Sequence, residues 1–301
     1  MADIIKIEPY FSKKIWGGQK LKDFGYNIGN DNIGEAWVLS AHPNGMSYLM
    51  LDDKKVSLLD FYNTNRTFFG NYPGEFPILA KIITANDNLS VQVHPTDEYA
   101  LRKHNSLGKP ESWYIIDCEE NSKLIYGHSA KNIGEFKKAI EDNKWDSILN
   151  KVSIKKGDFL YVEPGKIHAI TPNVTLFELQ RSSDITYRLY DYDRIDNGKK
   201  RELHIEDSLN NIVIPDTMEN IITDKKDFNF ESEFFSINKI NVQEKFTYIK
   251  PLDAKWMNFT ILSGEGKINN VKLKAGDTAI CDSLLEFFEI KGKIEIIFYW
   301  V

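Results

Sequence analysis

The sequence is poor in cysteine and carries no excess of positive charge. Its two cysteines, Cys118 and Cys281, lie far apart and form no C-x-x-C motif. A disulfide framework and a thiolate zinc site are therefore excluded, and a reducing compartment fits. The formal net charge is −6, and no stripe of Lys and Arg alternates with aromatic residues. We therefore expect no nucleic-acid partner.

Long apolar runs are also missing. The longest apolar stretch near the end of the chain, residues 296–301, is far too short to span a bilayer. The first six residues contain nothing like the apolar segment of a signal peptide. We therefore expect a cytoplasmic protein without a membrane partner.

What the chain does have is enough length and apolar content for two domains, with 301 residues of which 42% are hydrophobic. A weak internal repeat supports this division, because residues 273–278 (LKAGDT) resemble residues 154–159 (IKKGDF). In this alignment Phe287 falls where the first copy has His168. We predict two β barrels: a metal-binding catalytic domain with helical insertions over residues 1–234, and a smaller barrel without metal ligands over residues 235–301.

Most of the chain reads as short strands separated by turns, so the predicted class is mainly β with helical insertions. Residues 35–40 alternate as a half-buried strand would, and residues 210–229 resemble a connector. Three helices are expected: over residues 56–62, over residues 96–102 after a Thr cap, and from Asn132 to about Leu149 with one apolar face.

The strands around residue 90 gather reactive side chains. Residues 78–84 and 89–94 are strands joined by an Asn-Asp-Asn turn, and alternate side chains of a strand share a face. Ser90, Gln92 and His94 therefore point the same way. Lys109 and Glu111 do likewise on the next strand. The pattern indicates a reactive pocket.

A third segment contributes His168, which directly follows a Pro-Gly corner between two strands. Taken singly, each histidine is explained as a buried or loop histidine with satisfied hydrogen bonds, and Glu111 as a solvated glutamate. Together, two imidazoles and one carboxylate form a recognised catalytic zinc set, to which Gln92 can add a weaker oxygen. The same set accepts iron or manganese, because ligand type alone does not choose between these metals.

Two cations near this set have ordinary explanations as well. Lys109 can be explained as a surface lysine whose apolar stem is buried. Arg188 can be explained as the partner of Asp184, Asp191 or Asp193 in a structural ion pair. The remaining histidines are interpreted as structural.

Four ordered motifs resemble type I mannose-6-phosphate isomerases in their short bacterial form: residues 89–95 (LSVQVHP), 108–114 (GKPESWY), 164–170 (PGKIHAI) and 180–191 (QRSSDITYRLYD). The resemblance extends over essentially the whole chain. It implies a cupin-type jelly roll that holds one Zn²⁺ through Gln92, His94, Glu111 and His168. It also implies an active-site arginine at Arg188, with Ser90, Lys109, Glu178 and Asp184 lining the pocket.

The implied reaction interconverts mannose 6-phosphate and fructose 6-phosphate through a cis-enediol. Glu178 is the leading candidate for the base, and a metal-bound water or another carboxylate would also serve. Lys109 and Arg188 are the two cations available for the enediolate and the phosphate, and the sequence does not decide which of them binds which group. The alternatives are an iron-dependent cupin oxygenase and a non-catalytic cupin that senses sugar phosphates. The expected partner is a small sugar phosphate, and the expected assembly is a monomer or a weak homodimer.

Overall fold

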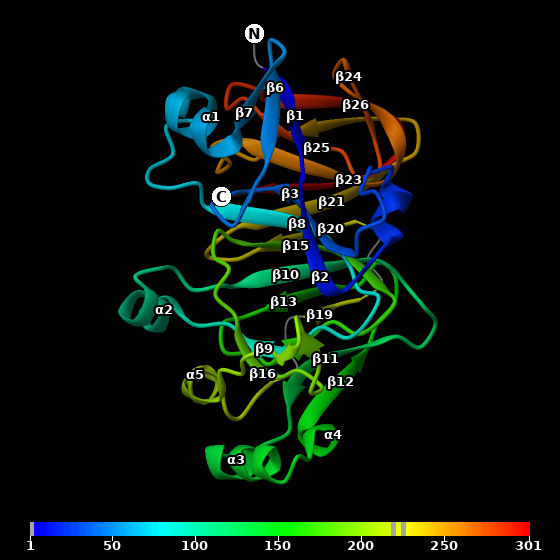
Figure 1. Ribbon diagram of the computed structural model, residues 1–301. Helices are drawn as coiled ribbons and strands as arrows, with labels where there is room; N and C mark the ends of the chain where they lie inside the picture. The colour runs from blue at the N-terminus through cyan, green and yellow to red at the C-terminus, as the bar shows by residue number, and fades with distance from the viewer. Residues whose placement is uncertain (1–2, 218–220, 224–226) are drawn as a thin grey trace.

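The structure is a computed structural model that describes residues 3–217, 221–223 and 227–301. Three antiparallel sheets are stacked one above the other, with most helices at the lower end and one side of the stack (Figure 1). The mainly β class expected from the sequence is confirmed.

The middle layer is a seven-stranded sheet in the order β19-β13-β10-β15-β8-β3-β2. Its strands are β2 (Tyr10–Gly18), β3 (Ile33–Leu39), β8 (Ile78–Thr84), β10 (Glu111–Cys118), β13 (Phe159–Val162), β15 (Val174–Arg181) and β19 (Ile221–Ile222). Every residue of β3 and β8 is buried, because other layers cover both faces of this sheet. The expectation of a half-buried strand over residues 35–40 is therefore wrong.

The lower layer is a five-stranded sheet in the order β12-β11-β14-β9-β16. Its strands are β9 (Val91–Val93), β11 (Lys123–His128), β12 (Leu149–Ser153), β14 (His168–Ala169) and β16 (Tyr187–Tyr190). Both the predicted strand around Gln92 and the predicted strand at His168 belong to it.

The upper layer is a ten-stranded sheet that combines both ends of the chain. It contains β1 (Ile4–Glu8), β6 (Tyr48–Leu51), β7 (Lys54–Ser57), β20 (Phe228–Glu231), β21 (Ser236–Val242), β22 (Lys245–Ile249), β23 (Met257–Ile268), β24 (Val271–Lys274), β25 (Thr278–Cys281) and β26 (Phe287–Trp300). In this sheet β1 pairs with β25 on one side and with β6 on the other. The N-terminal strands therefore complete the sheet that the C-terminal strands build.

Two short pairs stand outside the three layers. They are β4 (Ala41–His42) with β5 (Gly45–Met46), and β17 (Ile195–Asp196) with β18 (Lys199–Lys200). The proposed boundary between residues 234 and 235 remains a prediction. Part of the expected connector, residues 218–220 and 224–226, lies outside the described residues.

Strand alternation divides the core into layers. On β10, Tyr114 and Ile116 face the upper sheet, whereas Trp113 and Ile115 face the lower sheet. A further apolar cluster lies on the outer face of the lower sheet, where helices cover it. Burial of each large apolar side chain contributes about 1.5–3 kcal/mol, so these layers fix the relative positions of the sheets.

The helices are short and lie at the surface of the stack. They are α1 (Leu58–Thr64), α2 (Asp97–His104), α3 (Ile133–Glu141), α4 (Trp145–Ile148) and α5 (Ile205–Asn211), with the 3-10 helices η1 (Lys20–Phe24) and η2 (Arg66–Phe69). Thr96 and Asn132 cap α2 and α3 as expected, each accepting a hydrogen bond from a backbone N–H in the first turn.

Two helix predictions need correction. The first helix spans Leu58–Thr64 rather than residues 56–62, because Val56 and Ser57 still belong to β7. The single helix expected from Asn132 to Leu149 is interrupted after Glu141, where Asn143 adopts a left-handed conformation with φ 55°. Leu149 already begins β12.

The internal repeat is visible as two matching turns. Gly157 and Gly276 have φ values of 94° and 89°, a region that favours glycine. Asp158 accepts a hydrogen bond from the Lys155 N–H, and Asp277 accepts one from the Lys274 N–H. The second copy carries Phe287, half exposed at 55%, at the position of His168.

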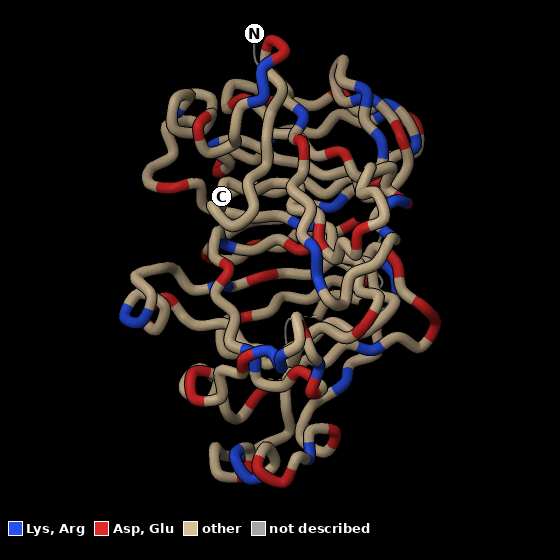
Figure 2. The backbone as a smooth tube through the Cα atoms, viewed as in Figure 1, with Lys and Arg blue, Asp and Glu red and all other residues tan. Residues whose placement is uncertain are grey.

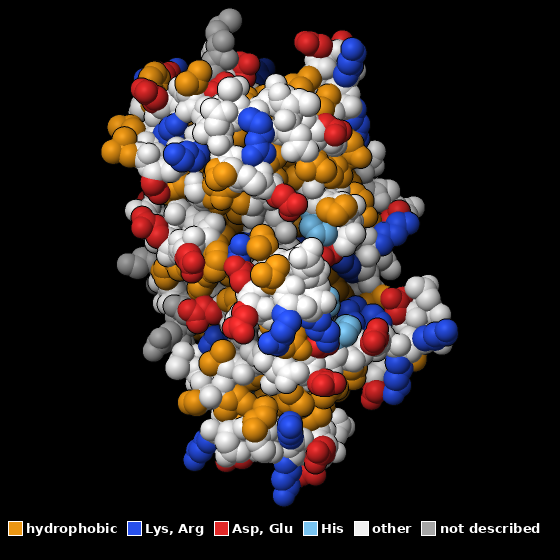
Figure 3. Space-filling view, turned by 90° about the vertical axis from the view of Figure 1, so that its left-hand side faces the viewer, with side chains coloured by type: hydrophobic (Ala, Val, Ile, Leu, Met, Phe, Trp, Pro, Cys, Tyr) orange, Lys and Arg blue, Asp and Glu red, His pale blue; other side chains and the backbone are white. Residues whose placement is uncertain are grey.

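Charged residues of both signs are interspersed along the chain (Figure 2). On the face shown in Figure 3 they alternate with apolar side chains and form no large patch of one sign. Within the described ranges, none of the helices is both long and apolar enough to cross a lipid bilayer.

Candidate metal centre and active site

Side chains from distant parts of the sequence meet because they are in register across neighbouring strands. In the lower sheet, His168 on β14 lies opposite Gln92 on β9, and Gln92 lies opposite Arg188 on β16. The three side chains form a row across the sheet. Directly opposed residues have Cβ atoms about 4.5–5.5 Å apart, so such a row makes one continuous surface.

A second row crosses the middle sheet. Trp37 on β3 lies opposite Lys81 on β8, Lys81 opposite Glu178 on β15, and Glu178 opposite Trp113 on β10. Lys81 Nζ donates to Glu178 Oε1 at 2.8 Å, and Trp113 Nε1 donates to Glu178 Oε2 at 2.9 Å. Glu111, two residues from Trp113 on β10, shares its face. The two rows belong to adjacent layers and enclose the site.

His94, Glu111 and His168 converge at one point. His94 Nε2 lies 3.2 Å from Glu111 Oε2, His168 Nε2 lies 3.3 Å from Glu111 Oε1, and the two Nε2 atoms are 3.1 Å apart. All three side chains have no exposed surface. Among the described residues, these three form a cluster of His and Glu side chains that is able to hold a metal ion.

The geometry fits a zinc ion. Nitrogen and oxygen ligands at about 2.0–2.2 Å from a tetrahedral Zn²⁺ lie roughly 3.3–3.5 Å from one another. The three observed separations fall within a few tenths of an ångström of this value. A contraction or expansion of that size requires only small side-chain rotations.

Backbone carbonyls orient both imidazoles. His94 Nδ1 lies 2.9 Å from the Ile185 carbonyl oxygen, and His168 Nδ1 lies 2.8 Å from the Lys166 carbonyl oxygen. Each ring therefore carries its proton on Nδ1, which leaves the Nε2 lone pairs directed at the common point. Such outer contacts fix the tautomer of metal-binding histidines in known metal sites.

Glu111 is a carboxylate that the protein alone does not satisfy. Its Oε1 atom is buried and has no hydrogen-bond partner among the described residues. Burial by itself would raise the pKa of Glu111, but Lys109 and the two imidazoles hold it well below its usual range. Burial and the Lys109 charge lower the pKa of His94 to about 4, and burial lowers that of His168. At neutral pH all three groups are therefore in the form that binds metal.

Gln92 and Lys109 complete the surroundings of this point. Gln92 Nε2 lies 3.3 Å from His168 Nε2, and rotation of the amide would present its oxygen instead. Lys109 Nζ lies 2.8 Å from Glu111 Oε2 and 3.0 Å from His94 Nε2. Lys109 is only 4% exposed, so its interpretation as a surface lysine is wrong.

A cavity of about 330 Å³ opens beside this point. Its volume is at the lower end of the range for small-molecule sites. It is lined by cations and by fewer carboxylates: Lys14, Lys81, Lys109, Arg188 and Arg201 against Glu35, Glu178 and Asp184. Such a lining suits a small ligand with negative charge.

Arg188 is the cation most available to such a ligand. Its Nη1 atom donates to the Glu202 carbonyl oxygen at 2.8 Å, and its buried Nε has no partner in the described part of the chain. The ion pair expected with Asp184, Asp191 or Asp193 is not formed among the described residues, and Asp191 binds Arg194 and Arg201 instead. Burial, together with the neighbouring charge of Arg201, lowers the pKa of Arg188. Both effects disfavour the positive charge of Arg188, and an anion bound in the cavity would compensate for them.

Comparison with known proteins identifies the family. Residues 4–120 match the family model for the catalytic domain of type I phosphomannose isomerase. The mannose-6-phosphate isomerase of Streptococcus mutans is 38% identical over 99% of this chain and 98% of its own length. The mannose-6-phosphate isomerase ManA of Bacillus subtilis is 38% identical over 96% of both chains. The chain belongs to the type I mannose-6-phosphate isomerase family.

The fold agrees with this assignment. The crystal structure of the mannose 6-phosphate isomerase from Bacillus subtilis superposes with a TM-score of 0.92, at 35% identity and over 99% of both chains. The resemblance read from the sequence motifs is therefore confirmed, as is membership of an enzyme family. The cavity and the candidate metal centre are its candidate active site.

The other side chains expected in this isomerase-family pocket lie on its wall. Ser90, Glu178 and Asp184 all line the cavity. Asp184 lies 3.6 Å from His42 Nε2 and accepts a hydrogen bond from the Asn44 side chain. Both oxygens of Glu178 accept hydrogen bonds from buried donors, so this carboxylate is firmly held. The roles assigned to these residues remain predictions.

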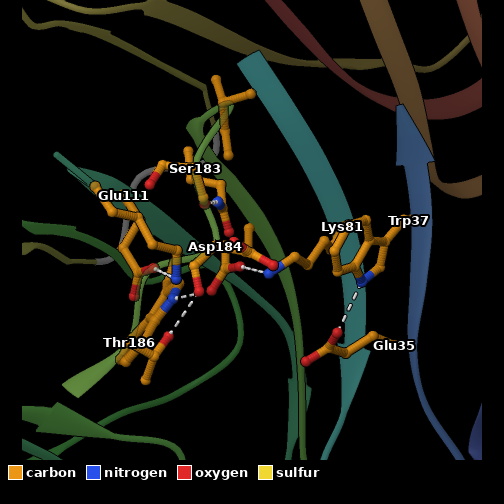
Figure 4. Close-up of polar contacts among 12 residues, drawn as sticks. Glu35, Trp37, Lys81, Glu111, Ser183, Asp184 and Thr186 are labelled. Atoms are coloured by element: carbon orange, nitrogen blue, oxygen red, sulfur yellow. Dashed lines mark hydrogen bonds and ion pairs between the residues drawn. The ribbon is translucent and has the colours of Figure 1, made fainter. Parts of the chain in front are cut away.

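Sequence reasoning missed Lys81 and its neighbours. Lys81 is the charged residue in the fully buried strand β8, and burial of a lysine without a partner is costly. Burial opposes its charge, but Glu178 and Glu35 raise its pKa, so it stays protonated. Figure 4 shows Lys81 beside Trp37, whose Nε1 donates to Glu35 Oε2 at 2.7 Å. A lysine within an apolar run was the signal for this part of the site.

Proposed function

We propose that the chain is a zinc-dependent isomerase that interconverts mannose 6-phosphate and fructose 6-phosphate through a cis-enediol intermediate. One observation carries the proposal: His94, Glu111 and His168 converge beside a small cavity whose wall presents Arg188. Family membership supports mannose 6-phosphate as one of the two substrates, since the relatives bear the name mannose-6-phosphate isomerase.

The reaction moves a proton between C2 and C1 of the sugar. Removal of a carbon-bound proton at neutral pH requires a positioned base and stabilisation of the enediolate oxygens. A zinc ion, held by His94, Glu111 and His168 with Gln92 as a fourth ligand, supplies a Lewis acid for those oxygens. Lys109, which already contacts Glu111 and His94, adds a positive charge at the same end of the cavity.

The phosphate of the substrate is expected to bind Arg188. Lys109 and Lys81 are each tied to a buried carboxylate, whereas Arg188 forms no ion pair in the described part of the chain. A guanidinium also offers the bidentate geometry that phosphate favours. We therefore assign the phosphate to Arg188 and the enediolate to Lys109, with Ser90 and Asp184 as further contacts to the substrate.

Glu178 is the base that we propose. Lys81 Nζ and Trp113 Nε1 donate to its two oxygens and hold the carboxylate in the cavity wall, beside the space that the substrate would occupy. Glu178→Gln preserves the shape of the side chain and removes its basicity. In deuterated water this variant should no longer exchange the C2 proton of mannose 6-phosphate for deuterium. Unchanged exchange would show that Glu178 is not the base.

The central experiment is a coupled assay on mannose 6-phosphate with metal analysis of the same sample. Turnover with zinc bound, loss after chelation and recovery on adding zinc are expected. An iron-dependent oxygenase would instead bind iron and consume oxygen, and a sensing protein would bind the sugar phosphate without turnover. Full turnover in demonstrably metal-free protein would end the zinc proposal.

The role of Arg188 is tested by Arg188→Ala. Loss of a charged stabiliser costs about 2.7–4 kcal/mol, so kcat/KM should fall roughly 10²- to 10³-fold. Arg102→Ala, which removes an exposed arginine of α2, is the control and should leave kcat/KM unchanged. Near wild-type kinetics in Arg188→Ala would remove this residue from the reaction.

We also propose that the protein acts on a small sugar phosphate in the cytoplasm as a monomer or weak homodimer. Light scattering across a range of protein concentrations would test the assembly.

A further inference from the structure

A second cavity, of about 850 Å³, lies on the outer face of the lower sheet. Val91, Ile125 and Leu149 contribute to its wall, and these residues belong to the apolar cluster beneath the helices. Gln92, the neighbour of Val91 on β9, lines the candidate active site instead. Since successive side chains of a strand point to opposite faces, β9 separates the two cavities.

A β-bulge supplies an aromatic residue to this outer face. Arg188 lies opposite Gln92, but Tyr190 lies opposite Val91, so Leu189 is an extra residue in β16. A bulge of this kind re-aims the side chains that follow it. Without it, Tyr190 would share the face of Arg188. With it, Arg188 lines the candidate active site and Tyr190 lines the outer cavity.

Three aromatic rings gather at this wall. Trp145 on α4 stacks on Tyr190 with ring centroids 4.7 Å apart and an interplanar angle of 18°, and Tyr192 lies 4.8 Å from Tyr190. All three side chains are partly exposed and line the cavity. Rings in a core would be fully buried, whereas these rings remain accessible to a ligand.

The rest of the wall is polar. Side-chain amides come from Asn88, Asn121 and Asn143. Three lysines line the cavity, and two of them are already paired, Lys144 with Asp142 at 2.9 Å and Lys151 with Asp146 at 2.8 Å. Lys123 is therefore the one lining lysine without an ion pair among the described residues.

We propose that this outer cavity binds a neutral saccharide of pyranose rings. A pyranose has one apolar C–H face, which packs on aromatic rings, and a rim of hydroxyls, which both donate to and accept from side-chain amides. The volume is within the range of small-molecule sites and accommodates more than one ring. A phosphorylated sugar fits less well, because Lys144 and Lys151 are already paired with carboxylates and only Lys123 is left to bind a phosphate.

Binding is tested by calorimetric titration of the zinc-loaded full chain with mannobiose, and with cellobiose and maltose as further probes. The titration is run with and without saturating mannose 6-phosphate. Saturable binding of at least one disaccharide that persists in the presence of the phosphate is expected. Absence of binding by all three, or its loss when mannose 6-phosphate is added, would overturn the proposal.

Two variants locate the site. Tyr190→Ala removes the central ring and should weaken binding about tenfold, the equivalent of 1.4 kcal/mol. Ser147→Trp adds a bulky side chain at the cavity wall without removing a packed one, and should abolish binding even if Tyr190→Ala folds poorly. Thr247→Trp, on the exposed strand β22, is the matched control.

Both cavity variants should retain isomerase turnover, because neither residue lines the candidate active site. Unchanged disaccharide affinity in Ser147→Trp would refute the assignment. Failure of the isomerase assay alone would not bear on it, since the binding measurement does not depend on turnover.

Discussion

Glu111 is buried between two imidazoles whose lone pairs face each other, and one of its oxygens has no hydrogen-bond partner in the part of the chain that the structure describes. An arrangement of this kind is unfavourable in a protein interior unless a cation compensates for it. Lys109 supplies one positive charge from one side. A divalent ion would satisfy all three side chains, and its binding can be tested by substitution of Glu111.

Glu111→Gln should remove the metal. The amide has the same shape but lacks the charge that anchors a dication, so zinc per chain should fall below about a tenth of the wild-type value, with a matching loss of turnover. Zinc content is measured by mass spectrometry after dialysis. Glu35→Gln, a buried glutamate outside the ligand group, is the control and should keep its zinc. Retention of zinc by Glu111→Gln would contradict the ligand assignment.

Acid should destabilise the metal-free protein through His94. Its pKa is about 4 in the folded chain and about 6.5 in an unfolded one. Between these values the unfolded state binds a proton that the folded state does not, so stability falls as pH drops from 6.5 towards 4. Thermal denaturation after chelation should show Tm falling over this window. His94→Gln should show a shallower fall, and an identical slope would contradict the prediction.

Much of the site could be predicted from strand alternation. Gln92 and His94 share a face because they are two residues apart, and a Pro-Gly corner marked the strand of His168. Lys81 could not be assigned in this way, because its role depends on the register between β8 and β15. Register comes from long-range pairing, which a single sequence does not reveal.

At the scale of elements, turns were easier to predict than bulges. The Gly-Asp turns of both repeat copies follow from local chemistry, since only glycine adopts their φ at little cost. The bulge at Leu189 contains no glycine that would indicate it in the sequence. Alternation alone would put Arg188 and Tyr190 on one face. The break between α3 and α4 was missed for a similar reason, because the apolar spacing continues across it.

Gly264 on β23 allows the packing of the upper sheet to be measured. At Gly264, φ is 78°, and a Cβ would lie 2.1 Å from the Lys293 carbonyl oxygen. Gly264→Ala should therefore combine backbone strain with overpacking, a loss of roughly 2–6 kcal/mol in the free energy of unfolding. Chemical denaturation with urea provides the measurement.

Gly157→Ala is the matched control. Its φ is 94°, but a Cβ there would meet no atom within 4 Å. Only the backbone strain remains, at about 1–2 kcal/mol. Equal losses in the two variants would show that close contact between β23 and β26 does not limit the sheet.

At the scale of the whole molecule, the upper sheet joins the two ends of the chain to the middle layer. The core between these layers includes Phe235, Trp256 and Tyr299 from the C-terminal part, and Tyr114 and Phe177 from the strands beside the site. Tyr114 also donates to Glu295, which pairs with Lys239. The fold class could be predicted from sequence, but this union of distant strands could not.

Removal of residues 235–301 should consequently unfold the remainder. The truncated chain would expose the face of the middle sheet that holds Tyr114 and Phe177, and β1 would lose its partner β25. We expect an insoluble product, or a soluble one without cooperative thermal unfolding in circular dichroism. Ile249→Ser, which changes an exposed residue of β22, should leave the transition intact. A soluble, active fragment would contradict this view.

The pairing of β1 with β25 also constrains the order of events during synthesis on the ribosome. Ile4 and Ile7 leave the exit tunnel long before their partners Cys281 and Thr278 have been translated. Strand β1 must therefore remain without this neighbour until β25 has emerged. Such distant pairing slows folding, and it makes the nascent protein dependent on whatever shields β1 in the meantime.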